Sequence, residues 1–398
     1  MSDAAPDNRW VLAFVAGAAL GGLLVAAGLR KKQRDDTDTI LHHMRDQRIK
    51  RTLTPLAKGS GQPKRSVTVH VPATSANIGS GYDCVGMALD MWNELTLSRA
   101  NEMSITVEGE GADDIPLDDS NLVVVGVKAA FKALGKDLPP LKYELRQRIP
   151  HGRGLGSSSA AIIAGLLAGL ALTGEKLDIT GKEELLQLAT EIEGHPDNVA
   201  PALYGGIQLG LHSGSQDRWM TKRVPVPHGL IFVIFIPTFT GKTSELREVV
   251  PKTVDLKDAV FNMGRLAWLV GSLVSGDTTD LREGFDDRLH QPYRGKAVYK
   301  HLYPVMKAAY DAGAIGAYLS GAGPSVMAIT SGGKGDFFTQ ADHHARADAA
   351  VAQAMQQVSK AMDIPGKVYI THPSSTGAVV VKADPPYSTP LVMYNGET

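Results

Sequence analysis

The chain has 398 residues, and 43% of them are apolar, which is enough for two packed domains of ordinary size. Its formal net charge of −1 leaves no basic excess that would indicate a nucleic-acid partner. The single cysteine, Cys84, excludes an internal disulfide, and without a Cys/His cluster a structural zinc site is not expected. This cysteine usage fits a reducing compartment.

The N-terminal segment stands apart in composition, because the run from Trp10 to Leu29 carries no charge. As a helix this run would be about 30 Å long, the thickness of a bilayer's hydrocarbon core. Arg30, Lys31 and Lys32 follow directly, so the segment predicts a membrane anchor whose downstream chain stays on the cytoplasmic side. Two alternatives stay open: a cleaved secretory signal, although its n-region is not basic, and a segment that targets a plastid or mitochondrion.

Downstream of this segment the chain is polar and charged, with a Gly/Ser/Pro/Lys stretch at 58–64 that indicates a tether. A short helix is expected at 39–52, and the first alternating, β-branched strand begins at Ser66. We therefore divide the chain into a hydrophobic segment with its basic flank (1–35), a linker (36–65), two folded domains (66–225 and 226–385) and a tail (386–398).

In the folded part, short apolar or alternating runs predict strands, and a 3.6-residue period predicts helices. Strands are expected at 66–71, 91–98, 103–107, 142–148, 206–211, 230–237, 317–319, 326–329, 367–370 and 378–381. Helices are expected at 121–134, 160–172, 183–192, 256–273, 304–311 and 341–361. Because the two kinds of element are mixed rather than strictly alternating, the pattern favours an α+β fold with two sheets over a doubly wound parallel sheet.

The strongest chemical signal is a glycine- and serine-rich loop that follows one strand and opens an apolar helix. Its glycines let backbone N–H groups approach an anion, and the helix N-terminus behind them favours negative charge. The loop lacks the lysine of a P-loop, and position 157 is Ser where the dinucleotide fingerprint needs a third glycine. A glycine-rich turn without a ligand is the alternative. The residues expected to contact nucleotide phosphates are Pro150, Gly152, Arg153, Gly154, Leu155, Gly156, Ser157, Ser158, Ser159 and Ala160.

Three further segments are dense in small polar residues. They read Pro-Ala-Thr-Ser-Ala-Asn at 72–77 with Gly-Tyr-Asp at 81–83, His-Pro-Asp-Asn-Val-Ala-Pro-Ala at 195–202, and Ser-Gly-Ala-Gly-Pro-Ser at 320–325. Together with the loop, with Thr-Ser-Glu-Leu-Arg at 243–247 and with Gln-Pro-Tyr-Arg at 291–294, they resemble the motifs of the GHMP kinases. The resemblance runs from Ser66 to near Val381 and leaves the N-terminal segment outside the fold.

The resemblance implies the two-domain GHMP kinase fold, with ATP bound by the N-terminal domain and with Mg²⁺ as the metal. Within the family it points to the homoserine kinases, and so to phosphorylation of the L-homoserine hydroxyl, a step toward threonine. Another activity of the family, on mevalonate or a sugar, is one alternative, and a binding protein without transferase activity is a second. A homodimer is kept as a candidate assembly. The glycine turn at 320–325 is expected to close against the phosphate loop.

An amino-acid substrate needs acceptors for its ammonium group and a cation for its carboxylate. The positions that match the family are Asn77 and Asp83 for the amino-acid end, Arg247 and Arg294 for the carboxylate, His195 and Asn198 in the substrate pocket, and Thr243 beside the transferred phosphoryl group. From these the expected catalytic set is Asn198, His195, Thr243 and Arg247. Taken singly, each of these residues has an ordinary structural alternative, such as a surface ion pair for an arginine.

Magnesium prefers oxygen ligands and keeps several waters, with substrate phosphates completing its shell. We expect its protein ligands to be Ser158, or Ser157, and the carboxylate of Glu191. Glu193 is the second choice for the carboxylate, because two residues further along a helix it would face a different direction.

Two other assignments follow from the resemblance. Asn121 matches a position near the adenine base. Asn198 lies near the position where some family members have an aspartate that takes the hydroxyl proton. Since an asparagine cannot take that proton, and phosphoryl transfer depends mainly on positioning and electrostatics, we expect direct transfer with Asn198 orienting the hydroxyl.

Overall fold

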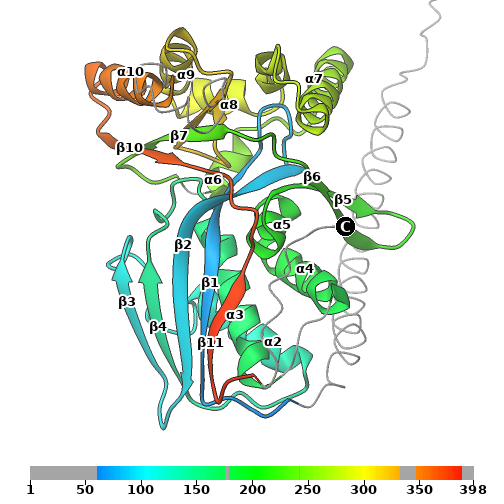
Figure 1. Cartoon of the computed structure of the whole chain (residues 1–398), viewed down its shortest axis with the longest axis vertical. Coiled ribbons are helices and arrows are strands. Elements are labelled where there is room, and N and C mark those ends of the chain that lie inside the picture. The colour runs from blue at the N-terminus through cyan, green and yellow to red at the C-terminus, as the bar shows by residue number, and fades with distance from the viewer. Residues whose placement is uncertain (1–60, 175–178, 242, 332–346, 388–398) are drawn as a thin grey trace, which may run out of the picture. The chain divides into compact units, whose positions relative to one another are not determined.

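A computed structural model of the chain describes residues 61–174, 179–241, 243–331 and 347–387 (Figure 1). The predicted anchor from Trp10 to Leu29, the helix expected at 39–52 and the chain end beyond residue 387 lie outside these ranges. Within the described residues, no helix is both long enough and apolar enough to cross a membrane. The chain from Leu56 onward forms one unit that contains two sheets.

The first sheet is built around its longest strand, β2 (Val85–Arg99), which pairs with three neighbours (Figure 1). The order is β11-β1-β2-β4-β3, while β5 pairs with the start of β2 and with β6. All of these pairs are antiparallel except β3 with β4. The other strands are β1 (Ser66–Ala76), β3 (Ser104–Gly109), β4 (Leu141–Gln147), β5 (Ile207–Ser213), β6 (Arg218–Val224) and β11 (Val379–Asp384).

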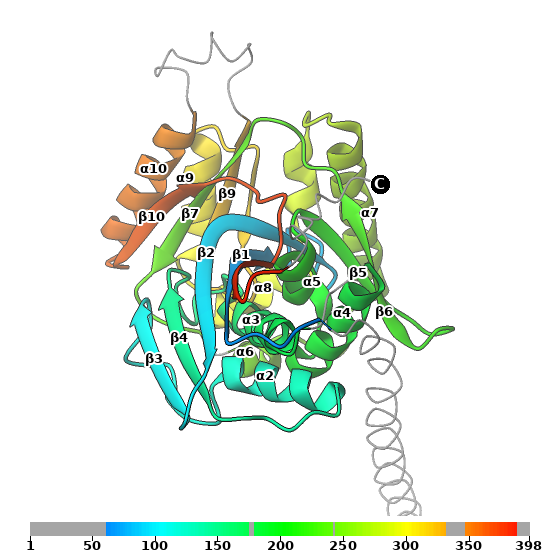
Figure 2. The same cartoon turned by 60° about the horizontal axis from the view of Figure 1, so that its bottom comes forward.

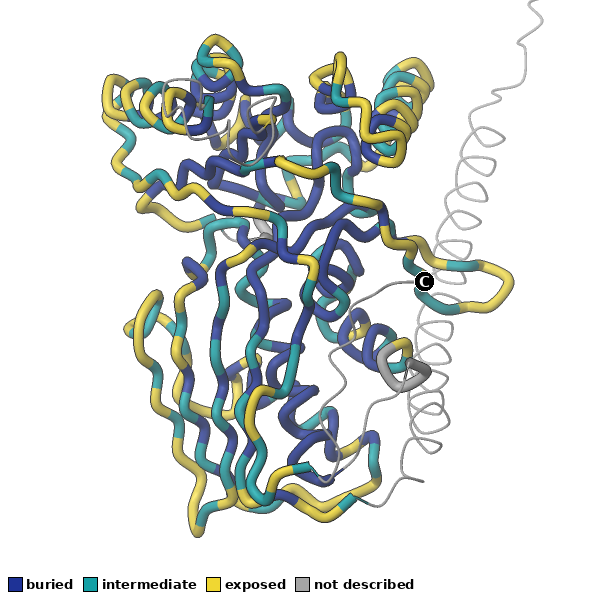
Figure 3. Tube along the Cα trace, in the orientation of Figure 1, coloured by how far each residue is buried: buried dark blue, intermediate teal, exposed yellow. Residues whose placement is uncertain are grey.

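Helices lie together on one face of this sheet, as the two views show (Figures 1 and 2). They are α2 (Leu122–Ala133), α3 (Ser157–Leu172), α4 (Ile179–Glu193) and α5 (Pro196–Tyr204). Side chains of β1 and β2 alternate between the core and the partly exposed face over much of their length, as expected for a sheet covered on one side. Helix α3 is apolar on every side and almost wholly buried (Figure 3), because it lies between the sheet and α2.

The second sheet is antiparallel throughout, in the order β10-β7-β9-β8. Its strands are β7 (Leu230–Pro237), β8 (Gly316–Leu319), β9 (Val326–Ser331) and β10 (Gly366–Thr371). Helices α9 (Leu302–Asp311) and α10 (Ala347–Ala361) share an apolar core with this sheet. The remaining elements of this half are α6 (Thr243–Glu248), α7 (Leu256–Ser275), the 3₁₀ helix η2 (Leu281–Phe285) and α8 (Gln291–Ala297).

The predicted α+β architecture with two sheets is confirmed. The division placed between residues 225 and 226 falls between β6 and β7, yet β11 returns to pair with β1, so the first sheet contains both ends of the folded chain. The polar segment that begins at His195 was not among the expected helices, and there the sequence prediction is wrong. The segment forms the helix α5, with Pro196 at the first turn, where proline is well tolerated.

Glycines allow α2 and α3 to pack at close range. A Cβ atom on Gly126 of α2 would clash with the carbonyl oxygen of Ile162, and one on Gly165 of α3 would clash with that of Val123. A glycine inside a helix lowers the stability of the helix by about 1 kcal/mol relative to alanine. The close packing explains why glycine is nevertheless present at these two positions. The close contact fixes α3 against the sheet and therefore fixes where its N-terminus lies.

We predict that Gly165→Ala lowers the free energy of unfolding by about 1–3 kcal/mol, because the added methyl group overpacks the α2–α3 contact. Gly264→Ala in α7 is the matched control, since nothing lies within 4 Å of its Cβ position. That change should stabilise the protein by about 0.5–1 kcal/mol. Urea unfolding of both variants measures this, and a stabilised Gly165→Ala protein would show that the helices are not in such close contact.

Candidate functional site

A cavity of about 550 Å³ collects most of the residues that the motifs predicted. Eleven of them line it: Asn77, Asp83, Gly152, Gly154, Gly156, Ser157, Ser158, His195, Asn198, Arg247 and Arg294. These residues come from segments far apart in the chain and from both halves of the fold. The cavity wall also includes eight residues outside the primary assignments: Asp114, His151, Glu193, Asp197, Thr240, Gly241, Gly321 and Ala322.

The glycine loop has an unusual backbone at three alternate positions. Gly152, Gly154 and Gly156 have φ angles of 62°, 74° and 68°, which residues with a side chain rarely adopt. There is also no space for a side chain, because a Cβ atom on Gly154 would clash with the Ser320 carbonyl oxygen and one on Gly156 with the Thr74 hydroxyl. The loop therefore depends on glycine both for its conformation and for its close contacts.

The N-terminus of α3 faces the cavity directly behind this loop. Gly156 is the residue before the helix and has no side chain to cap it, and no acidic side chain lies in the first turn. Gly156, Ser157 and Ser158 all line the cavity. The unpaired N–H groups and the positive end of the helix dipole favour an anion at this point.

A second glycine turn, at 320–325 between β8 and β9, closes against the loop as expected. The Ser320 hydroxyl donates to the Gly154 carbonyl oxygen at 2.7 Å, and the backbone N–H of Gly321 donates to the Ala76 carbonyl oxygen at 2.9 Å. Ser75 and Ser320 are joined by a hydrogen bond between their hydroxyl groups at 2.8 Å. The glycine loop is thus held by β1, where the Thr74 N–H donates to the Leu155 carbonyl oxygen at 3.1 Å, and by the second sheet through Ser320.

The other residues assigned to the loop contribute to its position rather than to the cavity wall. Arg153 donates to the carbonyl oxygens of Pro237, Thr238 and His151, so its guanidinium ties the loop to the end of β7. Pro150, Leu155, Ser159 and Ala160 are buried, and none is among the residues that line the cavity. Their assignment as phosphate contacts stays a prediction, and it would concern their backbone groups because their side chains are buried.

Asp83, which we assigned to the amino-acid end of the substrate, and Arg247, which we assigned to its carboxylate, bind each other in this structure. The guanidinium of Arg247 donates to both carboxylate oxygens of Asp83 at 3.0 Å. Asn77 holds this turn in place, since its Oδ1 accepts from the Asp83 backbone N–H at 2.8 Å and its Nδ2 donates to the Gly321 carbonyl oxygen at 2.9 Å. The pair is partly accessible, with 38% of the Arg247 side chain and 33% of the Asp83 side chain exposed.

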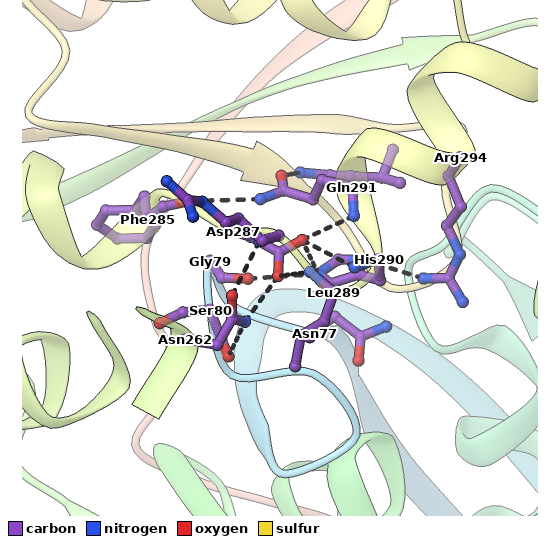
Figure 4. Close-up of polar contacts among 12 residues, drawn as sticks. Asn77, Gly79, Ser80, Asn262, Phe285, Asp287, Leu289, His290, Gln291 and Arg294 are labelled. Carbon is purple, nitrogen blue, oxygen red and sulfur yellow. Dashed lines mark hydrogen bonds and ion pairs between the residues drawn. The ribbon is translucent and has the colours of Figure 1, made fainter. Parts of the chain in front are cut away.

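Arg294 lies deeper, with an exposed fraction of only 1% although it lines the cavity. Its Nε donates to the Leu246 carbonyl oxygen and its Nη1 to that of Gly321, both at 3.2 Å. Nη1 also contacts Nδ1 of His290 at 3.2 Å (Figure 4). A buried guanidinium needs such partners, because an isolated charge in the protein interior is strongly disfavoured.

The start of α5 brings His195 and Asn198 to the cavity. Nδ1 of His195 is hydrogen-bonded to the carboxylate of Asp197, which is almost completely buried. Burial alone would lower the pKa of His195, but the hydrogen bond and the charge of Asp197 outweigh it and raise that pKa above its usual value. Oδ1 of Asn198 accepts from the Thr74 hydroxyl at 2.8 Å, and Asn198 lines the cavity.

Of the two carboxylates considered for the metal, the structure places Glu193 rather than Glu191 beside Ser158. The Ser158 hydroxyl donates to the carboxylate of Glu193 at 2.7 Å, and both residues line the cavity. Glu191 is exposed and is not part of the cavity wall, because a position two residues away on α4 faces another direction. Within the described residues, no cluster of three or more His, Cys, Asp or Glu side chains could hold a metal by itself. A pair of oxygen donors beside a phosphate site suits Mg²⁺ nevertheless, since phosphate oxygens and waters would complete its shell.

Two other assignments stay predictions. Asn121 is the N-cap of α2, where its Oδ1 accepts from the Val123 N–H and its Nδ2 donates to the Pro116 carbonyl oxygen. It is buried and does not line this cavity, and its assignment to the adenine site stays a prediction. Thr243 is the first residue of α6, and its side chain lies outside the described part of the structure.

The most informative omission from the sequence reading is Asp197. It lies inside the quoted motif at 195–202, but its role depends on α5, which brings its carboxylate to His195. Thr74 was likewise part of a quoted motif, and only the fold shows its hydroxyl bound to Asn198. Both residues could have been proposed as site residues from their place in the motifs, although not with these partners.

Comparison with known proteins gives consistent results. The family model for the GHMP kinases N terminal domain matches residues 121–206, and that for GHMP kinases C terminal matches residues 269–360. A homoserine kinase from Carboxydothermus hydrogenoformans is 39% identical over 332 residues, which is 83% of this chain and 99% of that protein. A homoserine kinase from a Synechococcus strain is 42% identical over 286 residues, covering 70% of this chain and 89% of that protein. A crystal structure of a homoserine kinase from Cytophaga hutchinsonii superposes with a TM-score of 0.69 at 31% identity, over 80% of this chain and 98% of that one.

Proposed function

This chain belongs to the GHMP kinase family, and we propose that it is a homoserine kinase, which transfers the γ-phosphoryl group of ATP to the hydroxyl of L-homoserine. The family and the kinase activity follow from relatives that are matched over almost their whole length. The roles that we propose for individual residues rest on the contacts of the residues that line the cavity.

The observation that carries the substrate assignment is the ion pair between Asp83 and Arg247. L-Homoserine is a zwitterion, so its ammonium can bind Asp83 while its carboxylate binds Arg247. The substrate would then replace one internal ion pair with two intermolecular pairs and leave the net charge of the site unchanged. Arg294 adds a second cation on the same wall of the cavity. Mevalonate has no ammonium group and would leave Asp83 without a partner.

The nucleotide belongs at the other end of the cavity, where the glycine loop and the N-terminus of α3 present backbone N–H groups. In the reaction the homoserine hydroxyl oxygen attacks the γ-phosphorus, the bond from that phosphorus to the bridging oxygen breaks, and ADP leaves. The hydroxyl proton passes to phosphate or solvent. Asn198 orients the hydroxyl, and its own amide is held in one orientation by Thr74. Protonated His195 would contribute positive charge rather than act as a base.

Magnesium would be held by Ser158 and Glu193 together with the nucleotide phosphates. When bound, it would neutralise charge on the phosphates. The membrane anchor, the compartment, the homodimer and the assignments of individual site residues stay predictions.

We predict that purified protein with Mg·ATP releases ADP with L-homoserine and much more slowly with mevalonate or galactose. The reason is the need for an ammonium at Asp83 and a carboxylate at Arg247. A coupled assay of ADP release, with the three acceptors in parallel and one sample without acceptor, measures it. Preference for mevalonate or galactose would reject the substrate assignment, and no transfer to any acceptor would favour a binding protein.

We also predict that Glu193→Gln raises the Mg²⁺ concentration needed for half-maximal binding of ADP by at least about tenfold, because it removes the only carboxylate bonded to Ser158 among the described residues. Glu191→Gln is the matched control on the same helix and should leave this concentration unchanged, since Glu191 is exposed outside the cavity. Calorimetric titration at several Mg²⁺ concentrations measures both. The reverse result would restore Glu191 as the ligand.

A further inference from the structure

A buried polar network lies directly behind Arg294 and is not explained by the assignments above. At its centre is His290, whose side chain is completely buried (Figure 4). His290 precedes α8 and Arg294 lies one turn further along, so the two side chains meet on one side of the helix. Nη1 of Arg294 lies 3.2 Å from Nδ1 of His290.

The partners of the ring determine which nitrogen carries the proton. An arginine can only donate hydrogen bonds, so Nδ1 of His290 must accept from Arg294. The carbonyl oxygen of Gly79 can only accept, so Nε2, at 3.3 Å, must donate to it. The ring is therefore neutral with its proton on Nε2. Burial favours the same state, since it lowers the pKa of His290.

Two neighbours hold the ring in this orientation. The Asp287 carboxylate accepts from the backbone N–H groups of His290 at 3.0 Å and of Gln291 at 2.7 Å, and from Nδ2 of Asn262 at 2.8 Å (Figure 4). It thereby fixes the backbone from which the ring projects. The ring of Tyr82 stacks on that of His290, with 5.0 Å between their centroids.

The effect on Arg294 is that one side of its guanidinium is fully occupied. Nε binds Leu246, and Nη1 binds both Gly321 and His290. Nη2 has no hydrogen-bond partner among the residues that the structure describes, although Arg294 lines the cavity. An unpartnered N–H pair on a buried guanidinium is costly unless a ligand or water binds it.

We propose that His290 is a positioning residue for substrate recognition: its neutral ring holds Nη1 of Arg294 so that Nη2 presents its two N–H groups to the substrate carboxylate. This inference rests on the proposed function, because it needs a substrate with a carboxylate. It assigns His290 no contact with the substrate and no part in the chemical step.

The test uses two substitutions that each keep a different half of the imidazole. His290→Asn keeps an acceptor at the position of Nδ1, whereas His290→Gln keeps a donor at the position of Nε2 but loses the acceptor for Arg294. We expect His290→Gln to raise the KM for L-homoserine about tenfold with kcat changed less than about twofold, and His290→Asn to stay within about threefold of the wild-type KM. L-Homoserinamide, in which a neutral amide replaces the carboxylate, should show no such difference between the variants.

Melting temperatures of both variants report whether either change merely disturbs the fold. Equal KM values for L-homoserine in the two variants, or equal losses with L-homoserine and L-homoserinamide, would overturn the positioning role while leaving the proposed function intact. Wild-type protein that transfers no phosphate to L-homoserine would instead refute the proposed function, and the inference with it.

Discussion

The contact between the glycine loop and the turn at 320–325 is the constraint on which the rest of the site depends. The Ser320 hydroxyl binds the Gly154 carbonyl oxygen, and no side chain fits between the two segments. One residue further, the Gly321 carbonyl oxygen accepts from both Asn77 and Arg294. This contact therefore sets the distance between the N-terminus of α3, where we propose that the phosphates bind, and Arg294, which we propose binds the substrate.

The charges in the cavity are arranged so that a zwitterionic substrate could bind with little loss of free energy from broken ion pairs. The pair of Asp83 and Arg247 is about one-third exposed, and a pair of this kind contributes only about 0–1 kcal/mol to stability. Opening it for a zwitterion is therefore inexpensive. Arg294 is different, because it is buried and its orientation is fixed by carbonyl oxygens and by His290. The site thus combines one arginine that can exchange partners with one that stays in place.

Much of this arrangement could be predicted from the sequence, because the relevant signals are local. Three alternate glycines before an apolar run predicted a loop that opens the buried helix α3, and the mixed order of elements predicted two sheets. What the sequence could not show depends on contacts between distant segments. Which of Glu191 and Glu193 faces Ser158 depends on how α4 is rotated about its axis. Asp287 and His290 became recognisable only when the fold brought Asn262, Gly79 and Arg294 around them. Asn121 is a related case, since only the fold shows that its side chain caps α2.

The central claim is that the glycine loop holds the nucleotide phosphates, and calorimetric titration of Mg·ADP into a Gly154→Ala variant tests it most directly. The added methyl group would clash with Ser320 and force the loop out of the conformation that Gly154 adopts at a φ of 74°. The account predicts that the Kd for Mg·ADP rises by at least about tenfold, while Gly214→Ala, at a position with nothing within 4 Å, binds as the wild type does. A folded Gly154→Ala protein with the wild-type Kd would contradict the account.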